Sequence, residues 1–596
     1  MEKRSIIAIV LVFLILLIWP FIFNRKKPSD VQPQQQQNEV IQKKEEKPKP
    51  KEPEPKITSN IPKGSIISVQ TPLYEAQLTT NDANIVSWKL KEYMNRTGES
   101  GYINLIPAGL RQYLTIKFDD PGIQKELYSA DWESDKKSLI LKDTPGSQDS
   151  INFAYTTSKG MKILKKMTFY GDSYIVDIDI EVQGPIVSGY NLVWGGGIVE
   201  DGVISTQELA NEGPIAMLRT DKGSKLIKHW QKSGFGCVGS KQIRIPRQEG
   251  PIYWIGFASK YFTAVLIPGN EHWWTALDKA GGRYTVDSSS NETSLSPKDV
   301  WQNWAGTTTI GLTVPSNNTE NQKFRAYIGP KKWSILRDIR KRDNTEENLN
   351  LGKMINFGVF SILGKATLWL LQVFYSVGKN YGIAIIFVSV LIKIIYLPLT
   401  QKSFNSMNKM QELQPKLNAL REKYRDDPQR LNKETMKFYK QQGASPLGGC
   451  LPILLQIPVF WALFSTLRGA VELRGAVFIS GWVNDLSLPD TVASIYGFPI
   501  RILPLLMTGS TLAQQFIFGT GSPGQNNKMM ALMPVFMLFI FYGMPSGLVL
   551  YWFCNDIFSF VHRFLIKRSQ KAAKIEENTN EKAKKETGNK TIKGRK

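Results

Sequence analysis

The sequence predicts a multi-domain membrane protein in which an all-β domain outside the bilayer is joined to an α-helical core within it. The first observation is a change along the 596 residues, from a polar first half with short strand-like runs to a strongly apolar final third. The second is a series of apolar segments long enough to cross a bilayer, separated by loops of very different charge. The third is the formal net charge of +23, which indicates anionic partners such as lipid headgroups or nucleic acid.

Residues 1–23 are predicted to be an uncleaved transmembrane anchor. The stretch from Ile6 to Phe23 is almost without polar residues, and no small-residue cleavage site follows it, as a secretory signal would require. Residues 24–57 are rich in Pro, Gln, Glu and Lys, a composition that cannot bury a core. They are predicted to form a disordered, semi-extended linker.

Residues 58–340 carry the signals of a β-sandwich. Between Tyr174 and Gln183, four β-branched residues at every second position alternate with three acidic ones, which predicts a strand with one wet face. Other short runs of this kind are separated by turn residues such as Gly160 and Gly171-Asp172. Many short strands with frequent turns are typical of two packed sheets.

Residues 351–379 are predicted to form an amphipathic helix in the membrane interface. Apolar side chains dominate, yet polar residues recur at spacings of four, seven, four and three, which places them on one helical face. These residues are Ser361, Lys365, Gln372, Ser376 and Lys379. The alternative is an additional spanning helix.

Five spanning helices are predicted within residues 381–566, which with the N-terminal anchor gives six spans in total. They are residues 381–399, about 449–467, about 502–519, 529–545 and 547–566. The fourth is very apolar and rich in methionine, whose flexible side chain adapts to varied apolar surfaces, although ordinary packing explains it equally well.

Loop charges predict the orientation of these spans. Residues 401–446 carry ten Lys and Arg and residues 567–596 carry eleven, whereas residues 468–500 carry two. The positive-inside rule therefore places 401–446, the basic tail 567–596 and both termini in the cytoplasm, with residues 24–350 on the opposite side. The three basic residues at 25–27 run against this assignment and are outweighed by the later loops.

The cytoplasmic segment 401–446 is predicted to be a helical hairpin. An apolar stripe from Met407 to Tyr424 steps by three and four, and Asp427-Pro428 has the pattern of a second helix start. Pro415 is expected to kink the first arm.

Lys393 is the first candidate functional residue, because it puts a charge inside the apolar segment 381–399. Intramembrane charges are costly and mark functional sites, although a lysine near a helix end also reaches the interface with its long side chain. Other polar residues lie in neighbouring spans, including Ser389, Gln456, Gln514, Asn555 and Asp556. They suggest either a hydrated cavity around Lys393 or helix–helix hydrogen bonds in which Asp556 neutralises it.

Several function classes lack support in the sequence. Cys237, Cys450 and Cys554 are widely separated and odd in number, so no disulfide framework is predicted. No phosphate-binding glycine loop is apparent, and neither a cofactor nor a metal is expected.

Several motifs resemble the YidC-type membrane protein insertases, the 60 kDa inner-membrane protein family of the Gram-negative type with a large periplasmic domain. Residues 445–460 (SPLGGCLPILLQIPVF) resemble the third-helix signature, and residues 545–552 (PSGLVLYW) the final-helix signature. Leu397-Pro398-Leu399-Thr400, with a basic residue five positions before the proline, is similar to the second helix. Residues 414–416, 254–268 and 327–330 are similar to the family's cytoplasmic hairpin and periplasmic domain, so the resemblance covers nearly the whole chain.

The resemblance implies an insertase and chaperone rather than an enzyme, with a periplasmic β-supersandwich at 58–340 and a five-helix core. In the family, a basic residue of the second helix, commonly Arg, lines a hydrophilic groove, and Lys393 occupies that position here. The usual Ser-Asn pair of the final helix reads Asn555-Asp556. The groove residues expected on this basis are Lys393, Ser389, Gln456, Gln514, Gln515, Tyr551, Trp552, Asn555 and Asp556.

The resemblance also implies a multi-pass inner-membrane location and four kinds of partner. These are nascent membrane proteins, Sec translocon components, the ribosome through the basic tail and cytoplasmic loop, and membrane lipids. The tail, with a net charge of +7, is equally compatible with lipid binding alone. Two rival functions are a solute transporter with Lys393 as an anion site, and a tethered carbohydrate-active enzyme using His229, His272 or carboxylates.

Overall fold

The computed structural model describes residues 64–569 apart from the following gaps: 97–100, 107–112, 129, 185–188, 196–197, 199–212, 221–222, 229, 234–240, 245–251, 270–283, 289–307, 315–320, 343–348, 444–450, 519–526 and 567. The predicted anchor, the linker and most of the basic tail lie outside the described residues, as does the first part of the motif at 445–460.

The first part of the described chain is built from three main sheets and one small hairpin. The largest sheet has nine strands, each antiparallel to its neighbours: β13 (Gly223–Lys228), β12 (Gly213–Thr220), β16 (Ile252–Ala258), β17 (Phe262–Pro268), β20 (Asn321–Pro330), β10 (Ile175–Gln183), β9 (Lys162–Tyr170), β8 (Gln148–Thr156) and β6 (Glu133–Ser134). The second sheet has the order β4 (Tyr102–Asn104), β3 (Asn84–Met94), β2 (Tyr74–Thr79), β1 (Ile66–Gln70) and β7 (Ser138–Ile140). The third has the order β18 (Tyr284–Ser288), β19 (Thr308–Val314), β11 (Tyr190–Gly195) and β5 (Tyr113–Phe118), and β14 (Trp230–Ser233) pairs with β15 (Lys241–Arg244).

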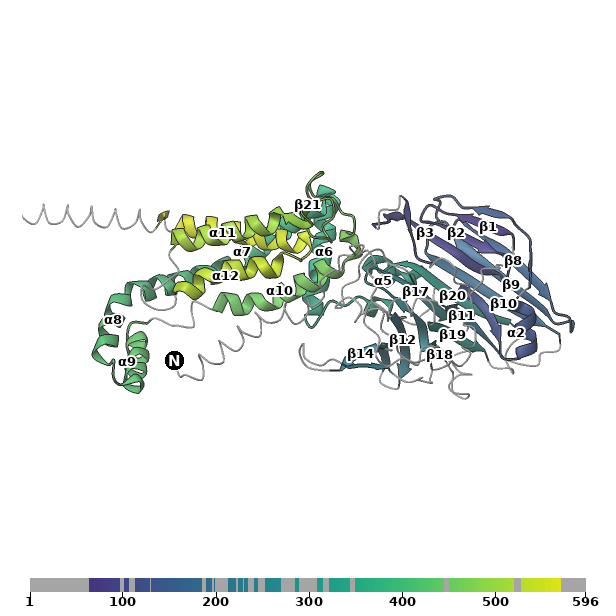
Figure 1. Cartoon of the computed structure of the whole chain (residues 1–596), viewed down its shortest axis with the longest axis horizontal. Coiled ribbons are helices and arrows are strands. Elements are labelled where there is room, and N and C mark those ends of the chain that lie inside the picture. The colour runs from purple at the N-terminus through teal and green to yellow at the C-terminus, as the bar shows by residue number, and fades with distance from the viewer. Residues whose placement is uncertain are drawn as a thin grey trace, which may run out of the picture.

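These sheets share one apolar core, and we call this part the β domain (residues 64–342; Figure 1). Trp88 of β3, Trp194 of β11 and Trp254 of β16 are all buried in it. The alternating pattern from Tyr174 to Gln183 forms β10, where the β-branched residues are buried and the acidic ones are half-exposed. The predicted strand is confirmed, and Gly160 and Gly171 lie in the turns that flank β9.

In the described part of the β domain there are two helices, and a short segment leads out of it. The helices are α2 (Pro121–Tyr128) and α5 (Trp333–Arg342). The 3-10 helix η3 (Leu351–Met354) follows, and Leu351 and Met354 are part of the β core. The long helix therefore begins only at α6 (Ser361–Gly378), ten residues after the start of the predicted range.

The second part of the chain is a helical bundle, which we call the helical core (residues 361–569; Figure 1). Its elements are α6, α7 (Tyr381–Glu412), α8 (Gln414–Lys423), α9 (Pro428–Gln441), α10 (Leu451–Gly469), the 3-10 helix η4 (Val471–Leu473), the hairpin β21 (Thr491–Ile495) and β22 (Phe498–Arg501), α11 (Ile502–Phe518), α12 (Asn527–Phe541) and a final helix over residues 546–566. The predicted combination of a β-rich domain and a helical core is confirmed.

Helix α6 lies across the end of the bundle that is nearest the β domain, whereas α7, α10, α11 and α12 run along the bundle (Figure 1). The buried face of α6, which includes Leu368 and Leu371, packs in the core of the bundle. Two of its predicted polar-face residues contact other segments: Gln372 donates to Glu472 (3.2 Å), and the Lys365 ammonium lies 4.8 Å from the centre of the Trp333 ring in α5. The location of α6 in the membrane interface stays a prediction.

Within the described residues, one helix is long and apolar enough to cross a membrane, over Tyr381–Ser403 in α7, and a shorter apolar helix runs over Ile502–Ile517. The number of spans therefore stays a prediction. Helix α7 also continues through Pro398 to Glu412, well beyond the predicted span.

The predicted first arm of the cytoplasmic hairpin is divided between two helices rather than kinked. Helix α7 ends at Glu412 and α8 begins at Gln414, with Pro415 in its first turn, where the missing N–H costs no helical hydrogen bond. Helix α9 begins at Pro428, and the side chain of Asp427 accepts from the Arg430 N–H, so the predicted helix start is confirmed.

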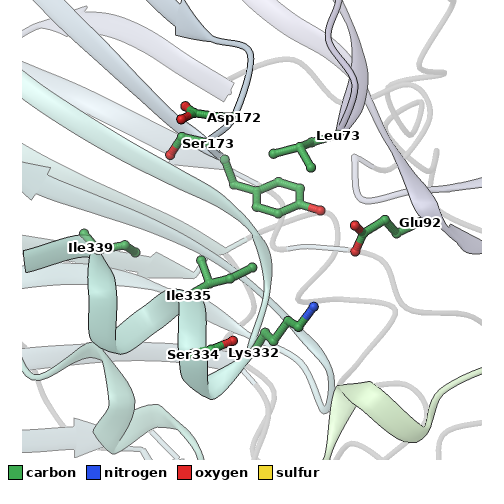
Figure 2. A pocket seen from close by; sticks show the side chains of 9 residues that line it. Leu73, Glu92, Asp172, Ser173, Lys332, Ser334, Ile335 and Ile339 are labelled. Carbon is green, nitrogen blue, oxygen red and sulfur yellow. The ribbon is translucent and has the colours of Figure 1, made fainter. Parts of the chain in front are cut away.

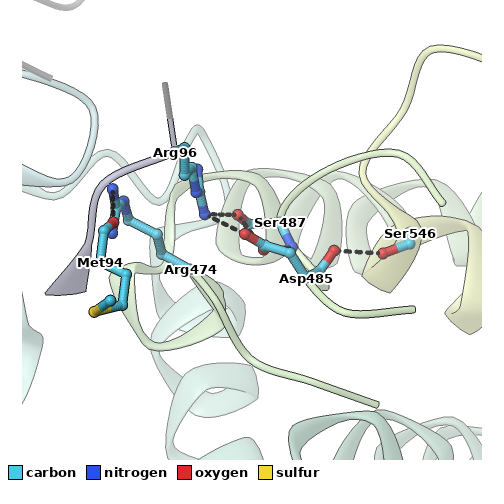
Figure 3. A network of polar contacts seen from close by, with 6 residues as sticks. All are labelled: Met94, Arg96, Arg474, Asp485, Ser487 and Ser546. Carbon is cyan, nitrogen blue, oxygen red and sulfur yellow. Dashed lines mark hydrogen bonds and ion pairs between the residues drawn. The ribbon is translucent and has the colours of Figure 1, made fainter. Parts of the chain in front are cut away.

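A polar contact joins the β domain to a loop of the helical core (Figure 3). Arg96, just after β3, forms an ion pair with Asp485 (2.6 Å) and donates to Ser487 (2.8 Å). Arg474 donates to the Met94 carbonyl (3.0 Å) from the other side. Asp485 in turn accepts, through its own carbonyl, from Ser546 at the start of the final helix (3.0 Å). We call this set the docking contact; it links the β domain to the first turn of the final helix.

Candidate functional site

Lys393 lies in the middle of α7 and is half-buried against the final helix. Its ammonium donates to the Ser559 hydroxyl (2.6 Å), which itself donates to the Asn555 carbonyl one turn earlier (2.7 Å). Ser559 thus receives the lysine without losing its bond to its own helix. A hydroxyl dipole satisfies one of the three ammonium hydrogens and does not neutralise the charge.

Asp556 is held by a different helix. Its carboxylate accepts from Thr511 of α11 (2.6 Å) and from Ser510 (3.4 Å), and Gln514 donates to its main-chain carbonyl (3.2 Å). Among the described residues, no ion pair joins Asp556 to Lys393. In place of the neutralising pair, which was one of the two alternatives open from the sequence, the final helix makes two separate attachments, to α7 through Ser559 and to α11 through Asp556.

The charged residues of the final helix fall on one face because of their spacing. Asp556, Ser559 and Arg563 follow one another by three and four positions. Asp556 and Arg563 both lie close enough to Lys393 to interact with it electrostatically, and so does His562. Among the residues that the structure describes here, the cations Lys393 and Arg563 interact with the carboxylate of Asp556.

Arg563 and Thr511 are absent from the predicted groove residues, although both contribute to this cluster. The signal for Arg563 was present in the sequence, since it follows Asp556 by seven residues, two helical turns on the same face. Thr511 is one turn before Gln515 and one position from Ser510, but nothing in the sequence distinguishes it from the other hydroxyl residues of α11.

The remaining predicted residues occupy two kinds of position. Ser389 is buried and donates to the Ile385 carbonyl of its own helix (2.7 Å), and Gln515 is half-buried on α11. Tyr551 is buried in the core of the bundle, and Gln456 approaches its hydroxyl without a hydrogen bond of normal geometry. Trp552 packs against other aromatic rings: the centre of its ring lies 5.2 Å from that of Phe460 and 5.0 Å from that of Phe541.

The structure therefore brings Lys393, Gln514, Asn555 and Asp556 together, with Ser559, Thr511 and Arg563 beside them. We call Lys393, Thr511, Asp556, Ser559 and Arg563 the polar cluster. Within the described residues, no group of three or more His, Cys, Asp or Glu is placed to hold a metal ion.

A second candidate site is a cavity of about 210 Å³ in the β domain beside α5. Its lining combines Leu73, Ile335 and Ile339 with the charged residues Glu92 and Lys332, whose charged ends point toward the same space (Figure 2). His229 and His272, which the carbohydrate-enzyme alternative named, lie outside the described residues.

Comparison with known proteins identifies the family. The profile of the 60Kd inner membrane protein family matches residues 373–574, and that of the YidC periplasmic domain matches residues 66–370. The membrane protein insertase YidC of Syntrophus aciditrophicus (strain SB) is 30% identical over 595 residues, which cover 95% of this chain and 100% of that protein. The chain belongs to the YidC family of membrane protein insertases.

A second relative agrees with this assignment. The membrane protein insertase YidC of Syntrophobacter fumaroxidans is 29% identical and covers 95% of this chain and 100% of its own. Among solved structures, that of an active YidC insertase with its first transmembrane domain resolved is 15% identical with a TM-score of 0.36, covering 94% of this chain and 99% of that chain. Membership of the YidC family makes the chain an inner-membrane protein, and the β domain is its periplasmic domain.

Proposed function

We propose that this protein is a membrane protein insertase and chaperone in which the polar cluster forms part of a hydrophilic groove within the bilayer. The observation that carries the proposal is the position of Lys393. It lies in the most clearly membrane-spanning helix of the described chain, yet its charge is held by one hydroxyl rather than by a carboxylate.

Such a lysine lowers the cost of bringing polar chain into the membrane. A polar segment that leaves water loses its hydrogen bonds unless the new environment replaces them. The polar cluster offers an ammonium, hydroxyls and a carboxylate at the depth of the bilayer, and an acidic client residue gains an attraction to Lys393. At a separation of about 4 Å and an effective dielectric constant of about 20, that attraction amounts to roughly 4 kcal/mol.

In the mechanism we propose, the short extracytoplasmic segment of a nascent membrane protein enters the groove from the cytoplasm. Lys393, Ser389, Gln456, Gln514 and Gln515 exchange hydrogen bonds with it in place of water. The apolar part of the client moves along α10 and α12 into lipid, where the hydrophobic effect drives insertion without nucleotide hydrolysis. On this account the protein forms no covalent intermediate and is not an enzyme.

The topology that this mechanism requires is the predicted one. It has six spans, both termini in the cytoplasm and residues 24–350 in the periplasm, with the hairpin of α8 and α9 and the basic tail facing the ribosome. The position of α6 across the periplasmic end of the bundle supports it, because an additional span there would reverse every later segment (Figure 1). Sec translocon components are proposed as partners through the family alone.

The proposal is tested by inserting a small single-span client with an acidic periplasmic tail into proteoliposomes that contain the purified protein and no nucleotide. Protease protection of the translocated tail measures insertion. We expect protection well above that of protein-free liposomes, and unchanged when ATP is added. Insertion no better than in protein-free liposomes, from protein shown to be folded, would refute the proposal.

A further inference from the structure

The hairpin of β21 and β22 is an exposed apolar element at the periplasmic end of the helical core. It forms a two-stranded sheet of its own, and every residue of β21 is exposed. Its exposed residues include Phe498 (63%), Ile495 (55%), Val492 (43%) and the fully exposed Tyr496. No charged residue lies between Thr491 and Ile500. A two-stranded hairpin with apolar side chains on both faces is at best marginally stable in water.

The turn at the tip of the hairpin has a backbone conformation that does not suit its residues. Ile495 pairs with Phe498, so Tyr496 and Gly497 form a two-residue turn, and both have positive φ values of 50° and 79°. Asn or Asp with Gly is the favourable choice for such a turn, whereas a bulky aromatic residue is strained there. No segment that the structure describes covers the Tyr496 ring, since the side chain is fully exposed. A strained aromatic residue at an exposed tip indicates a contact outside the molecule.

The base of the hairpin is fixed to the ends of three segments. The buried Asp490 accepts from the Leu503 N–H at the start of α11 (2.6 Å) and from the Trp482 indole (3.3 Å). At the other strand, the Tyr542 hydroxyl donates to the Pro499 carbonyl, and Arg501 donates to the Tyr542 carbonyl. The Tyr542 ring also stacks on Phe498 at 5.5 Å. The hairpin is therefore held rigidly at the ends of α11 and α12.

This attachment places the tip at the level of the membrane surface. Helix α11 begins at Ile502, immediately after the hairpin, and Figure 1 shows β21 at the same end of the bundle as α6 and standing out from its side. Helix α6 exposes Ile362, Trp369 and Val377 at this level. Trp and Tyr are enriched at membrane–water interfaces, and Trp, Phe and Leu form the apolar face of helices that lie in them.

We propose that the β21–β22 hairpin inserts its tip into the periplasmic leaflet, and that Tyr496 and Phe498 anchor the helical core there from the side. The occupant of this surface is the headgroup and upper acyl region of the lipid. The uncharged tip fits this environment, and Arg501 at the base lies where lipid phosphates are expected. The expected depth of the tip is about 5–10 Å into the boundary between headgroups and acyl chains.

The experiment is a depth measurement with spin labels on the full-length protein in vesicles of phosphatidylethanolamine and phosphatidylglycerol. A label is attached at Tyr496→Cys in a background of Cys237→Ala, Cys450→Ala and Cys554→Ala. The matched control is Ile140→Cys, another exposed apolar position (73%) that lies on β7 in the β domain. The collision rate of the spin label with oxygen, which concentrates in lipid, is compared with its collision rate with a water-soluble nickel complex.

We expect the label at position 496 to collide more often with oxygen, and the label at position 140 to collide more often with the nickel complex. Nickel dominance at 496 would place the tip in water, and protection from both reagents would place it against protein, such as a second copy or a client; either result overturns the proposal. A second label at Val492→Cys guards against disturbance of the tip by the first. In the protein labelled at position 492, the further substitution Tyr496→Asn suits the turn better, so the hairpin should stay folded, as measured by hydrogen exchange. The label at 492 should then move toward water. An unchanged depth in the Asn variant would contradict the anchoring role of Tyr496.

Discussion

The β domain and the helical core each hold a lysine away from bulk water, and they hold it differently. Lys165 of β9 is 1% exposed and donates to two main-chain carbonyls, those of Ala83 and Leu114, each at 2.5 Å. Both carbonyls belong to residues with positive φ, at 43° and 62°. Lys165 therefore holds together two strained segments of the β domain, and its partners are rigid main-chain groups.

Lys393 of α7 is only half-buried and donates to a single side-chain hydroxyl, that of Ser559. Its further neighbours are the charged side chains of Arg563, which repels it, and Asp556, which attracts it, whereas Lys165 interacts with the carboxylate of Asp82. In the described residues, Lys165 therefore donates to two main-chain acceptors, whereas Lys393 donates to one hydroxyl and has further hydrogens that another molecule could accept. On this basis we interpret Lys165 as structural, and the proposed function assigns Lys393 to contact with a client.

The largest effect is expected for Lys165→Met, which keeps the length of the side chain and removes both hydrogen bonds. Two buried carbonyls lose their donor next to strained residues, so the free energy of unfolding of the β domain should fall by about 2–4 kcal/mol. Hydrogen exchange of β2, β3 and β9 in the full-length protein measures this loss. Lys166→Met is the matched control, because Lys166 is exposed on the same strand and should change stability by less than about 0.5 kcal/mol. Equal effects of the two variants would show that Lys165 holds nothing together.

The second effect concerns pH. Burial lowers the pKa of Lys165 to about 8 from its usual 10.5, so between these values the unfolded chain binds the proton more often than the folded one. Stability should therefore rise with pH across about 8 to 10.5, by up to roughly 3 kcal/mol, relative to Lys165→Met at each pH. The neutral amine keeps two hydrogens for the two carbonyls. A difference between the proteins that stays constant from pH 7 to pH 11 would contradict the burial argument.

The third effect tests the join between the two regions. Arg96→Ala removes a partly buried, charge-assisted ion pair with Asp485 and should weaken the docking contact by about 1–3 kcal/mol. Faster hydrogen exchange of the loop at residues 470–490 would report this. Lys91→Ala is the matched control, since its pair with Glu75 (3.5 Å) is more exposed and should matter little. In the double variant Arg96→Ala/Asp485→Ala the two losses should not add, and full additivity would deny a direct interaction.

The fourth and smallest effect sharpens the role of charge in the polar cluster. Asp556→Asn keeps an acceptor for Thr511 but removes the negative charge near Lys393. An acidic client should then be attracted more strongly, by about 1 kcal/mol, which is about fivefold in insertion rate. A client with an uncharged tail provides the control and should be unaffected. A slower rate for the acidic client would mean that Asp556 helps insertion in another way.

The sequence predicts those features that depend on a repeating pattern. The alternation in β10, the helix start at Pro428 and the polar face of α6 all appear in the structure, because period and capping are local properties. The inward position of Lys165 was available in the same way, since it alternates with the buried Ile163 and Met167 on β9. The role of Lys165 could not be predicted from the sequence, because its two acceptors, Ala83 and Leu114, lie 82 and 51 residues away.

The polar cluster shows the same limit. Lys393 and Asp556 are conspicuous in apolar segments, but the sequence leaves open whether they pair, and only the packing of α11 shows that the Asp556 carboxylate accepts from Thr511. The docking contact joins Arg96 to Asp485, 389 residues away, and neither residue belongs to a pattern. Long-range polar partners are chosen by the fold, so residue type and spacing alone do not reveal them.

The central claim, that the charge of Lys393 is available to clients, is tested most directly by comparing wild type, Lys393→Arg and Lys393→Ala in the proteoliposome assay with an acidic-tailed single-span client. We predict insertion near the wild-type rate for Arg, which keeps the charge, and a loss of at least about tenfold for Ala, corresponding to about 1.4 kcal/mol. Equal insertion by all three proteins would contradict the claim, and so would loss in the Arg variant with activity retained in the Ala variant.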